Sequence, residues 1–178
     1  MSKTTIVAVL LALAVAACAG ESGHESTPRI HVDIESVSKA DDVQPVDGIA
    51  SAGQPDADEF RVFAEAGYVA VVDLRGPDED RGLDEAKVIA ELGLDYVQLP
   101  IVGDDAINFE NAEKLDSLLA DYDGPVLLHC GSGNRVGAML ALRKSLDGAQ
   151  AEEALDYGRS AGLTRLEPVV KKRLAETN

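Results

Sequence analysis

The 178-residue sequence has no tryptophan, few aromatic residues (4%), two cysteines and three histidines. Two cysteines cannot build a disulfide-rich scaffold. No histidine stands at the spacing of a metal-binding motif, so we expect neither a metal nor a cofactor. Basic residues are also scarce: 16 Lys and Arg stand against 32 Asp and Glu, which gives a formal net charge of -16. A nucleic-acid-binding protein needs a basic face to neutralise phosphates, so the composition excludes this class.

The longest apolar run has 12 residues, from Ile6 to Ala17. A bilayer takes about 20 apolar residues to cross, so this run indicates the core of a signal peptide, with Lys3 in front of it. The run ends in Val15-Ala16-Ala17-Cys18. This tetrad resembles the lipobox of bacterial lipoproteins, which implies removal of residues 1–17 and lipidation of Cys18. The alternative is a secretory signal that is cleaved near an unmodified cysteine.

The residue after Cys18 is alanine rather than aspartate, and an aspartate there would suggest retention at the inner membrane. We therefore expect an exported, periplasmic protein that is lipid-anchored to the outer membrane. Residues 19–29 are small and polar and indicate a linker. The expected organisation is a signal peptide over 1–17, a lipidated cysteine and flexible linker with a short strand over 18–44, and a catalytic domain over 45–178.

From about residue 45 onward, the patterns of strands and helices alternate. Short apolar runs predict strands at 49–52, 69–74, 96–100 and 126–129. Asp56, followed by Glu59, predicts a capped helix that ends at Gly67, and further helices are predicted near 83–92, 107–122, from 135 onward, 149–161 and 167–176. This alternation predicts an α/β fold in three layers, with a mostly parallel central sheet and helices on both faces.

The residues that carry chemistry are concentrated where the strand at 126–129 ends. The sequence there is His129-Cys130-Gly131-Ser132-Gly133-Asn134-Arg135. Glycines allow a tight turn whose amides point inward, and the following helix directs its positive end to the same space. Such a cradle binds a tetrahedral oxyanion and favours the thiolate form of Cys130. Arg135 offers two parallel donors to the same anion.

A purely structural interpretation of this stretch stays open. A free cysteine is often a small buried apolar residue, and glycine-rich turns between strand and helix are common in this fold class. His129 is expected to support the loop by hydrogen bonding rather than to act as a base, because neighbouring side chains in a strand point to opposite faces.

The order of several motifs resembles the phosphatase-like domain of beta-lactamase-hydrolase-like proteins, within the cysteine-dependent protein tyrosine and dual-specificity phosphatase superfamily. The motifs are Gly53-Gln54-Pro55, Val71-Val72-Asp73-Leu74-Arg75, Leu99-Pro100-Ile101, Gly124-Pro125-Val126 and the loop from His129 to Arg135. The resemblance implies a protein tyrosine phosphatase-like fold. It implies that Cys130 is the nucleophile, that Arg135 clamps phosphate, and that the amides of Gly131, Ser132, Gly133, Asn134 and Arg135 bind its oxygens.

The same resemblance implies a general acid on the loop after the preceding strand. Asp104 and Asp105 occupy that region, with Asp104 the first choice and a solvated acidic turn as the alternative. Arg75 is expected either at the rim of the pocket or in a surface pair with Asp78 or Glu79.

Two departures from the phosphatase pattern leave three functions open. Only four residues separate Cys130 from Arg135, where phosphatases have five, and Val136 replaces the usual Ser or Thr. The hypotheses are a phosphomonoester hydrolase, a rhodanese-like sulfurtransferase with a persulfide on Cys130, and a non-catalytic lipoprotein that binds an anion or a partner. The expected partner is a small phosphorylated or sulfur-oxyanion substrate, or a phosphoprotein, with no nucleic acid and with the membrane touched only through the lipid anchor.

Overall fold

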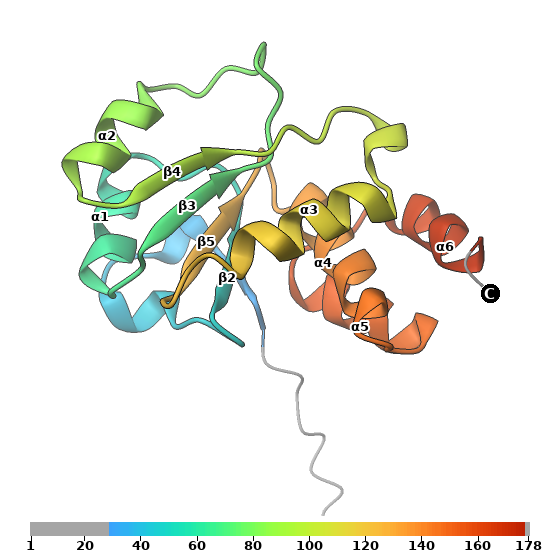
Figure 1. Cartoon of the computed structure of the whole chain (residues 1–178). Coiled ribbons are helices and arrows are strands. Elements are labelled where there is room, and N and C mark those ends of the chain that lie inside the picture. Colours follow the sequence, from blue (N-terminus) through green and yellow to red (C-terminus); the bar gives the residue numbers. More distant parts are fainter. Residues whose placement is uncertain (1–28, 177–178) are drawn as a thin grey trace, which may run out of the picture.

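The computed structural model describes residues 29–176 and contains one five-stranded sheet. All of its strand pairs are parallel, and the spatial order is β1-β2-β5-β3-β4 (Figure 1). The strands are β1 (His31–Val32), β2 (Ile49–Ala52), β3 (Ala70–Asp73), β4 (Asp95–Gln98) and β5 (Val126–His129). The expected signal peptide and the lipidation site Cys18 lie outside the described residues.

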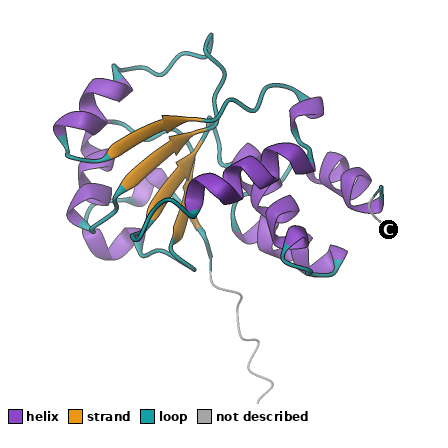
Figure 2. Ribbon diagram, viewed as in Figure 1, coloured by secondary structure: helices purple, strands orange, loops and turns teal. Residues whose placement is uncertain are grey.

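Helices cover both faces of this sheet, as Figure 2 shows. One face carries α1 (Ala57–Glu65) and α2 (Glu85–Glu91), and the other carries α3 (Phe109–Leu119), α4 (Asn134–Leu146), α5 (Ala151–Ser160) and α6 (Glu167–Ala175). Short 3-10 turns occur at Ile34–Ser36, Ala40–Val43 and Asp104–Ala106. The predicted three-layer α/β fold is confirmed. Within residues 29–176, none of the helices is both long enough and apolar enough to cross a membrane.

The local signals for the first helix are confirmed in detail. The Asp56 carboxylate accepts hydrogen bonds from the backbone N–H groups of Asp58 and Glu59, and the Glu59 side chain accepts one from Asp56 N. Gly67 follows the helix with a φ of +87°, a conformation that glycine adopts without strain. The capping box therefore sets where α1 begins.

The folded domain begins upstream of the expected boundary at residue 45. Strand β1 pairs with β2, and Ile30 and Val43 are fully buried. The hydroxyl of Tyr68 donates a hydrogen bond to the carbonyl oxygen of Val43. The segment from residue 30 to 44 is therefore part of the domain, because its apolar side chains complete the sheet edge and the core beneath α1.

Helices α4 and α5 approach each other through two glycines. A methyl group at Gly137 would collide with the backbone nitrogen of Leu163 and would lie 2.6 Å from the carbonyl oxygen of Gly158. A methyl group at Gly158 would lie 2.7 Å from the Ala141 Cβ. Backbone atoms cannot move aside as a flexible side chain can, so the packing of these helices requires glycine at both positions.

We predict that Gly137→Ala lowers the free energy of unfolding by about 3 kcal/mol or more, because the added methyl group overpacks the helix contact. Gly93→Ala is the matched control, since Gly93 has open space around it and only its φ of +77° opposes a side chain. We expect the control to cost about 1 kcal/mol. Denaturant unfolding of both variants measures the difference, and equal losses would contradict the packing argument.

Candidate active site

The predicted chemistry lies at the carboxyl end of the sheet, where β5 ends at His129 and α4 begins at Asn134. Residues 130–133 form the bend between them, and Gly133 has a φ of +75°. The arrowheads of the central strands converge on this region in Figure 1. Cys130 is 1% exposed and packs at the edge of the core between the sheet and α4. Helix geometry leaves the first backbone N–H groups of α4 without intrahelical acceptors, and these groups face the same bend.

The bend is held from the edge of the sheet by His31, whose role the sequence did not suggest. A methyl group at Gly133 would lie 2.6 Å from His31 Nδ1, and one at Gly162 would lie 2.9 Å from the same atom. His31 Nδ1 lies 3.4 Å from Ser51 Oγ, which donates to the carbonyl oxygen of Ala161. The imidazole therefore fills the space between the bend and the turn after α5. Burial lowers the pKa of His31.

Arg135 is held in place by Glu79, a residue on the loop after β3. The two terminal nitrogens of the guanidinium donate to Glu79 Oε1 and Oε2 at 2.6 and 2.7 Å. The carbonyl oxygens of Leu74 and Ile101 each lie 3.4 Å from Arg135 Nη1. Hydrogen bonds to Glu79 raise the pKa of Arg135 despite burial, and interaction with Cys130 acts in the same direction. The guanidinium is therefore fixed next to the sulfur rather than turned outward.

Glu79 is in turn oriented by the backbone. Its Oε1 accepts a hydrogen bond from Gly76 N at 2.7 Å. Hydrogen bonds from Arg135 lower the pKa of Glu79, although burial opposes this. The sequence-based alternative of an Arg75–Glu79 surface pair is wrong, because Glu79 pairs with Arg135 instead.

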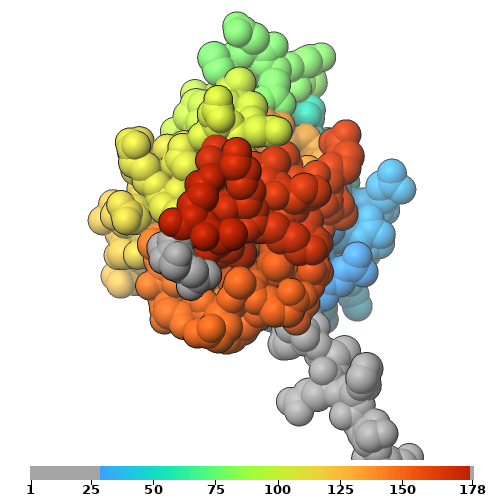
Figure 3. All heavy atoms as spheres, turned by 90° about the vertical axis from the view of Figure 1, so that its right-hand side faces the viewer, coloured from blue at the N-terminus to red at the C-terminus, as the bar shows by residue number. Residues whose placement is uncertain are grey.

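A cavity of about 630 Å³ opens above the bend. Of the predicted residues, its lining includes Asp104, Gly131, Ser132, Asn134 and Arg135. The other lining residues are Glu79, Ile101, Val102, Gly103, Ile107, Arg165 and Leu166. In Figure 3 the segment around residues 100–110 (yellow) lies directly beside the start of α6 (red). The cavity is therefore built from four segments that are distant in sequence: the loop after β3, residues 101–107, residues 131–135 and residues 165–166.

The two aspartates that sequence reasoning placed in this region are separated by the structure. Both residues are exposed, but Asp104 lines the cavity, whereas Asp105 lies 3.6 Å from the Arg173 guanidinium. Both residues belong to the 3-10 turn at Asp104–Ala106. The two carboxylates therefore lie in different surroundings, one at the cavity and the other beside α6.

Asn134 uses its side chain to tie the bend to the connection between α5 and α6. Asn134 Oδ1 accepts hydrogen bonds from Thr164 N at 2.8 Å, Thr164 Oγ1 at 3.1 Å and Leu166 N at 3.4 Å. The side chain is 6% exposed, so these bonds are shielded from water. Residue 165 is thereby placed at the cavity, a consequence that the loop motif alone did not reveal.

His129 points to the opposite face of the sheet and enters a buried ionic cluster. Its ring packs edge-on against Phe60, with 5.7 Å between the ring centres, and neither ring nitrogen has a hydrogen-bond partner. The expectation that His129 supports the loop by hydrogen bonding is therefore wrong for its side chain. The contribution of His129 to the loop is through its carbonyl oxygen, which accepts from Leu74 N at 3.0 Å.

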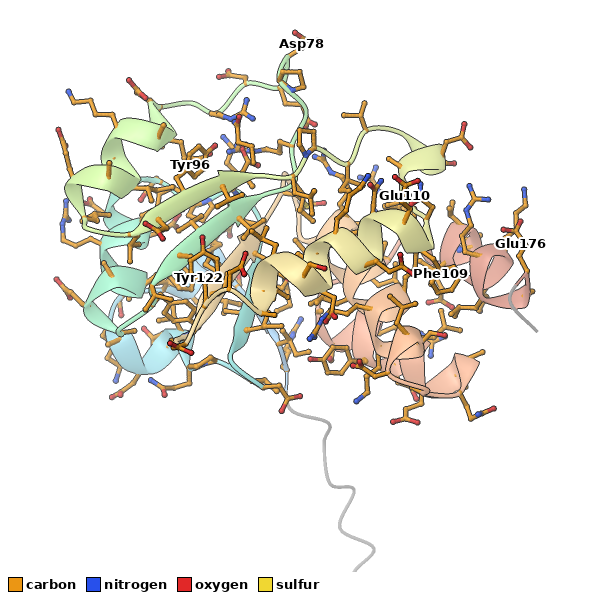
Figure 4. The ribbon with its side chains drawn as sticks, in the orientation of Figure 1. Asp78, Tyr96, Phe109, Glu110, Tyr122 and Glu176 are labelled. Atoms are coloured by element: carbon orange, nitrogen blue, oxygen red, sulfur yellow. The ribbon has the colours of Figure 1, made fainter. Side chains whose placement is uncertain are left out.

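Arg75 lies at the centre of this cluster and not at the pocket rim. Its guanidinium donates to Asp73 and to Glu85, and both side chains are buried. Asp78, the other partner expected for Arg75, lies at the outer tip of the loop between β3 and α2 (Figure 4). Tyr96 points toward the cluster, and its hydroxyl lies 3.0 Å from Asp73 Oδ2 and 2.9 Å from Glu85 Oε2.

The charges of the cluster are balanced internally. Burial opposes ionisation of Asp73, but hydrogen bonds from Arg75 outweigh it and lower the pKa of Asp73 to about 2. Burial raises the pKa of Glu85. Asp73, Glu85 and His129 lie close enough together to hold a metal ion. However, Arg75 and Arg81 already supply two positive charges to the two carboxylates, so the donor set does not fit a further cation.

Comparison with known proteins places these features in a family context. The family model described as DSP-PTPase phosphatase fused to NAD+ kinase matches residues 29–168. A beta-lactamase hydrolase-like protein of Xylella fastidiosa (strain Temecula1) is 32% identical over 136 residues, which cover 72% of this chain and 31% of that protein. A protein of the same description from Agrobacterium fabrum is 28% identical over 116 residues, which cover 62% of this chain and 27% of that protein. The chain thus spans about a third of the length of the curated relatives it matches.

Solved structures show the same fold. A protein of Neisseria meningitidis Z2491 that is classed with the phosphatases superposes with a TM-score of 0.63 at 19% identity, covering 73% of this chain and 93% of that one. The Pseudomonas aeruginosa protein TpbA, solved in complex with pTyr, superposes with a TM-score of 0.51 at 19% identity. The superposition covers 76% of this chain and 95% of that one. Sequence identities of 19% establish a similarity of fold alone.

The buried position of His129 predicts acid-sensitive stability. Burial lowers the pKa of His129 to about 3, so the folded protein keeps the ring neutral while the unfolded chain takes up a proton below about pH 6.5. The stability that His129 contributes is complete above pH 6.5 and is lost as the pH falls toward 3, by up to about 1.4 kcal/mol per pH unit. We expect His129→Leu to flatten this slope.

Denaturant unfolding at several pH values between about 3.5 and 7 measures the slope rather than the absolute stability. The other members of the cluster do not produce the same signature. The raised pKa of Glu85 favours the folded state at low pH, and the lowered pKa of Asp73 acts only below about 3.8. An unchanged slope in the variant would show that His129 takes up a proton in the folded protein.

Proposed function

Because the chain belongs to the family of DSP-PTPase phosphatases fused to NAD+ kinase, we propose that it is a cysteine-dependent phosphomonoester hydrolase. The observation that carries this proposal is the segment of residues 130–135, which comprises the bend and the first two residues of α4. It combines a buried cysteine, a tight glycine turn at a helix N-terminus, and an arginine whose guanidinium is fixed beside the sulfur. The phosphatase-like fold itself is shared with the solved relatives.

In the first step of the proposed reaction, the Cys130 thiolate attacks phosphorus and forms an S–P bond. The bond between phosphorus and the ester oxygen breaks, and Asp104 gives its proton to the departing oxygen. Arg135 and the amides of the bend hold the equatorial oxygens, where negative charge must be stabilised. Glu79 keeps Arg135 in position for this role through its bidentate contact.

In the second step, water attacks phosphocysteine and the S–P bond breaks. The Asp104 carboxylate takes the proton from this water, inorganic phosphate leaves, and Cys130 returns as the thiolate. Val136 is fully buried next to Arg135 and offers no hydroxyl to the departing sulfur. We therefore expect this second step to limit turnover.

The short loop and Val136 support a second candidate function, sulfur transfer. The Cys130 thiolate would attack the outer sulfur of thiosulfate, sulfite would leave, and the resulting persulfide would pass its sulfur to an acceptor thiolate or cyanide. This reaction needs no acid for the leaving group and no hydroxyl at position 136. It uses the same amides and the same thiolate at Cys130.

The proposed substrates are small anions. With a net charge of -16 the protein repels polyanions at long range, whereas the bend attracts a small phosphorylated compound or an exposed phosphorylated side chain. We further propose that the protein acts in the periplasm, anchored through Cys18, which the apolar run and the tetrad before that cysteine support.

One pair of assays on the purified full-length protein separates the candidates. We expect hydrolysis of p-nitrophenyl phosphate, a loss of about 10³-fold or more in Cys130→Ser, and no thiocyanate from thiosulfate and cyanide. Cys18→Ser is the matched control and should keep full activity. Thiocyanate formation that depends on Cys130, without phosphate release, would instead assign sulfur transfer. Absence of both reactions would contradict an enzymatic role.

Asp104→Asn should lower kcat/KM for phenyl phosphate by about 10²-fold, because this leaving group needs a proton, and should affect p-nitrophenyl phosphate less. Asp105→Asn is the control with the same change of charge one residue away, and we expect less than about a twofold effect. Steady-state kinetics with both substrates gives the comparison. A larger effect at Asp105 would reverse the assignment of the acid.

A further inference from the structure

Arg165 is one of two arginines in the described part of the chain that have no carboxylate within ion-pair distance, and it is the one that lines the cavity. Seven of the nine arginines within residues 29–176 lie within ion-pair distance of an acid, and Arg29 and Arg165 do not. The seven are Arg61, Arg75, Arg81, Arg135, Arg143, Arg159 and Arg173. With twice as many acids as bases in the chain, an unpaired guanidinium beside a cavity is unusual.

The acid nearest to Arg165 in sequence is already occupied. Glu167 lies 2.8 Å from Arg159 and 2.6 Å from Lys171. Hydrogen bonds from Arg159 and Lys171 lower the pKa of Glu167 to about 2. Arg165 is therefore left exposed at the cavity with its charge uncompensated by its neighbours on α6.

The backbone around Arg165 is fixed to the bend that carries Cys130. The amides of Thr164 and Leu166, on either side of Arg165, both donate to Asn134 Oδ1. Asn134 is the first residue of α4 and directly precedes Arg135. A backbone held in this way keeps the base of the Arg165 side chain at a constant position relative to an anion on the bend, which is what a specificity determinant needs.

The cavity has room for more than the anion on the bend. Its volume of about 630 Å³ lies in the range of sites that hold whole small molecules, and Arg135 and Arg165 both line it. Arg135 is paired with Glu79 and, in the proposed reaction, also binds the phosphoryl oxygens, so Arg165 is the cation of this lining that a second anionic group can use.

We propose that Arg165 binds a second anionic group, so that the site selects small substrates with two separate anionic groups, for example a phosphomonoester that also carries a carboxylate. This proposal rests on the proposed function to the extent that the first anion must bind at residues 130–135. The guanidinium donates two hydrogen bonds to the carboxylate, and the remainder of the substrate lies across the cavity between the two anions.

Binding to the full-length Cys130→Ser protein tests this proposal without turnover. The ligands are phenylphosphonate, which has one anionic group, and 3- and 4-carboxyphenylphosphonate, which have two. In calorimetric titrations, we expect Arg165→Ala to weaken a carboxylated ligand about five- to tenfold and phenylphosphonate less than about twofold. Arg165→Lys should recover part of the loss, and the preference for the carboxylated ligand should shrink as salt is raised.

Arg61→Ala is the matched control, since it removes the same charge from an exposed arginine on α1, on the other face of the sheet. We expect it to leave both affinities unchanged. If Arg165→Ala weakens all ligands equally, or none of them, the role of Arg165 is overturned while the proposed function stands. If the protein with Arg165 intact binds no phosphonate at all, both the role of Arg165 and the proposed function fall.

Discussion

The ion pair between Arg135 and Glu79 connects the two loops on which the site depends. Arg135 belongs to the bend after β5, and Glu79 belongs to the loop after β3, so the pair fixes the carboxyl ends of two adjacent strands relative to each other. A guanidinium without this partner would be free to turn toward solvent, where its charge is better hydrated. With the partner, the same side chain stays beside Cys130.

The opposite face of the sheet supplies the rigidity that this arrangement needs. Asp73 and Arg75 lie on the strand and loop that lead to Glu79, and both are buried in the ionic cluster with Glu85. Removing one partner of a buried ion pair leaves an uncompensated charge, so these residues act as a unit. The cluster therefore anchors the start of the loop after β3, while its far end remains exposed around Asp78 (Figure 4).

The four-residue spacing between Cys130 and Arg135 is compatible with both proposed reactions, phosphomonoester hydrolysis and sulfur transfer. A shorter bend offers fewer amides to an oxyanion, and Val136 cannot donate a hydrogen bond to the sulfur. Both features are compatible with slow hydrolysis of phosphocysteine and with a stable persulfide. Of the two proposed reactions, only phosphoryl transfer gives a role to Asp104, which lines the cavity.

Local sequence determined the helices, the strands and the bend after β5, since strand patterns, the Asp56 capping box and the motif from Cys130 to Arg135 involve residues that are neighbours along the chain. Only the tertiary structure decided which residues complete the site. Glu79 and Arg135 are 56 positions apart, and Asn134 and Thr164 are 30 apart. His31 reaches the bend from a strand at the sheet edge. Such contacts depend on strand order and helix packing, and no short pattern encodes them.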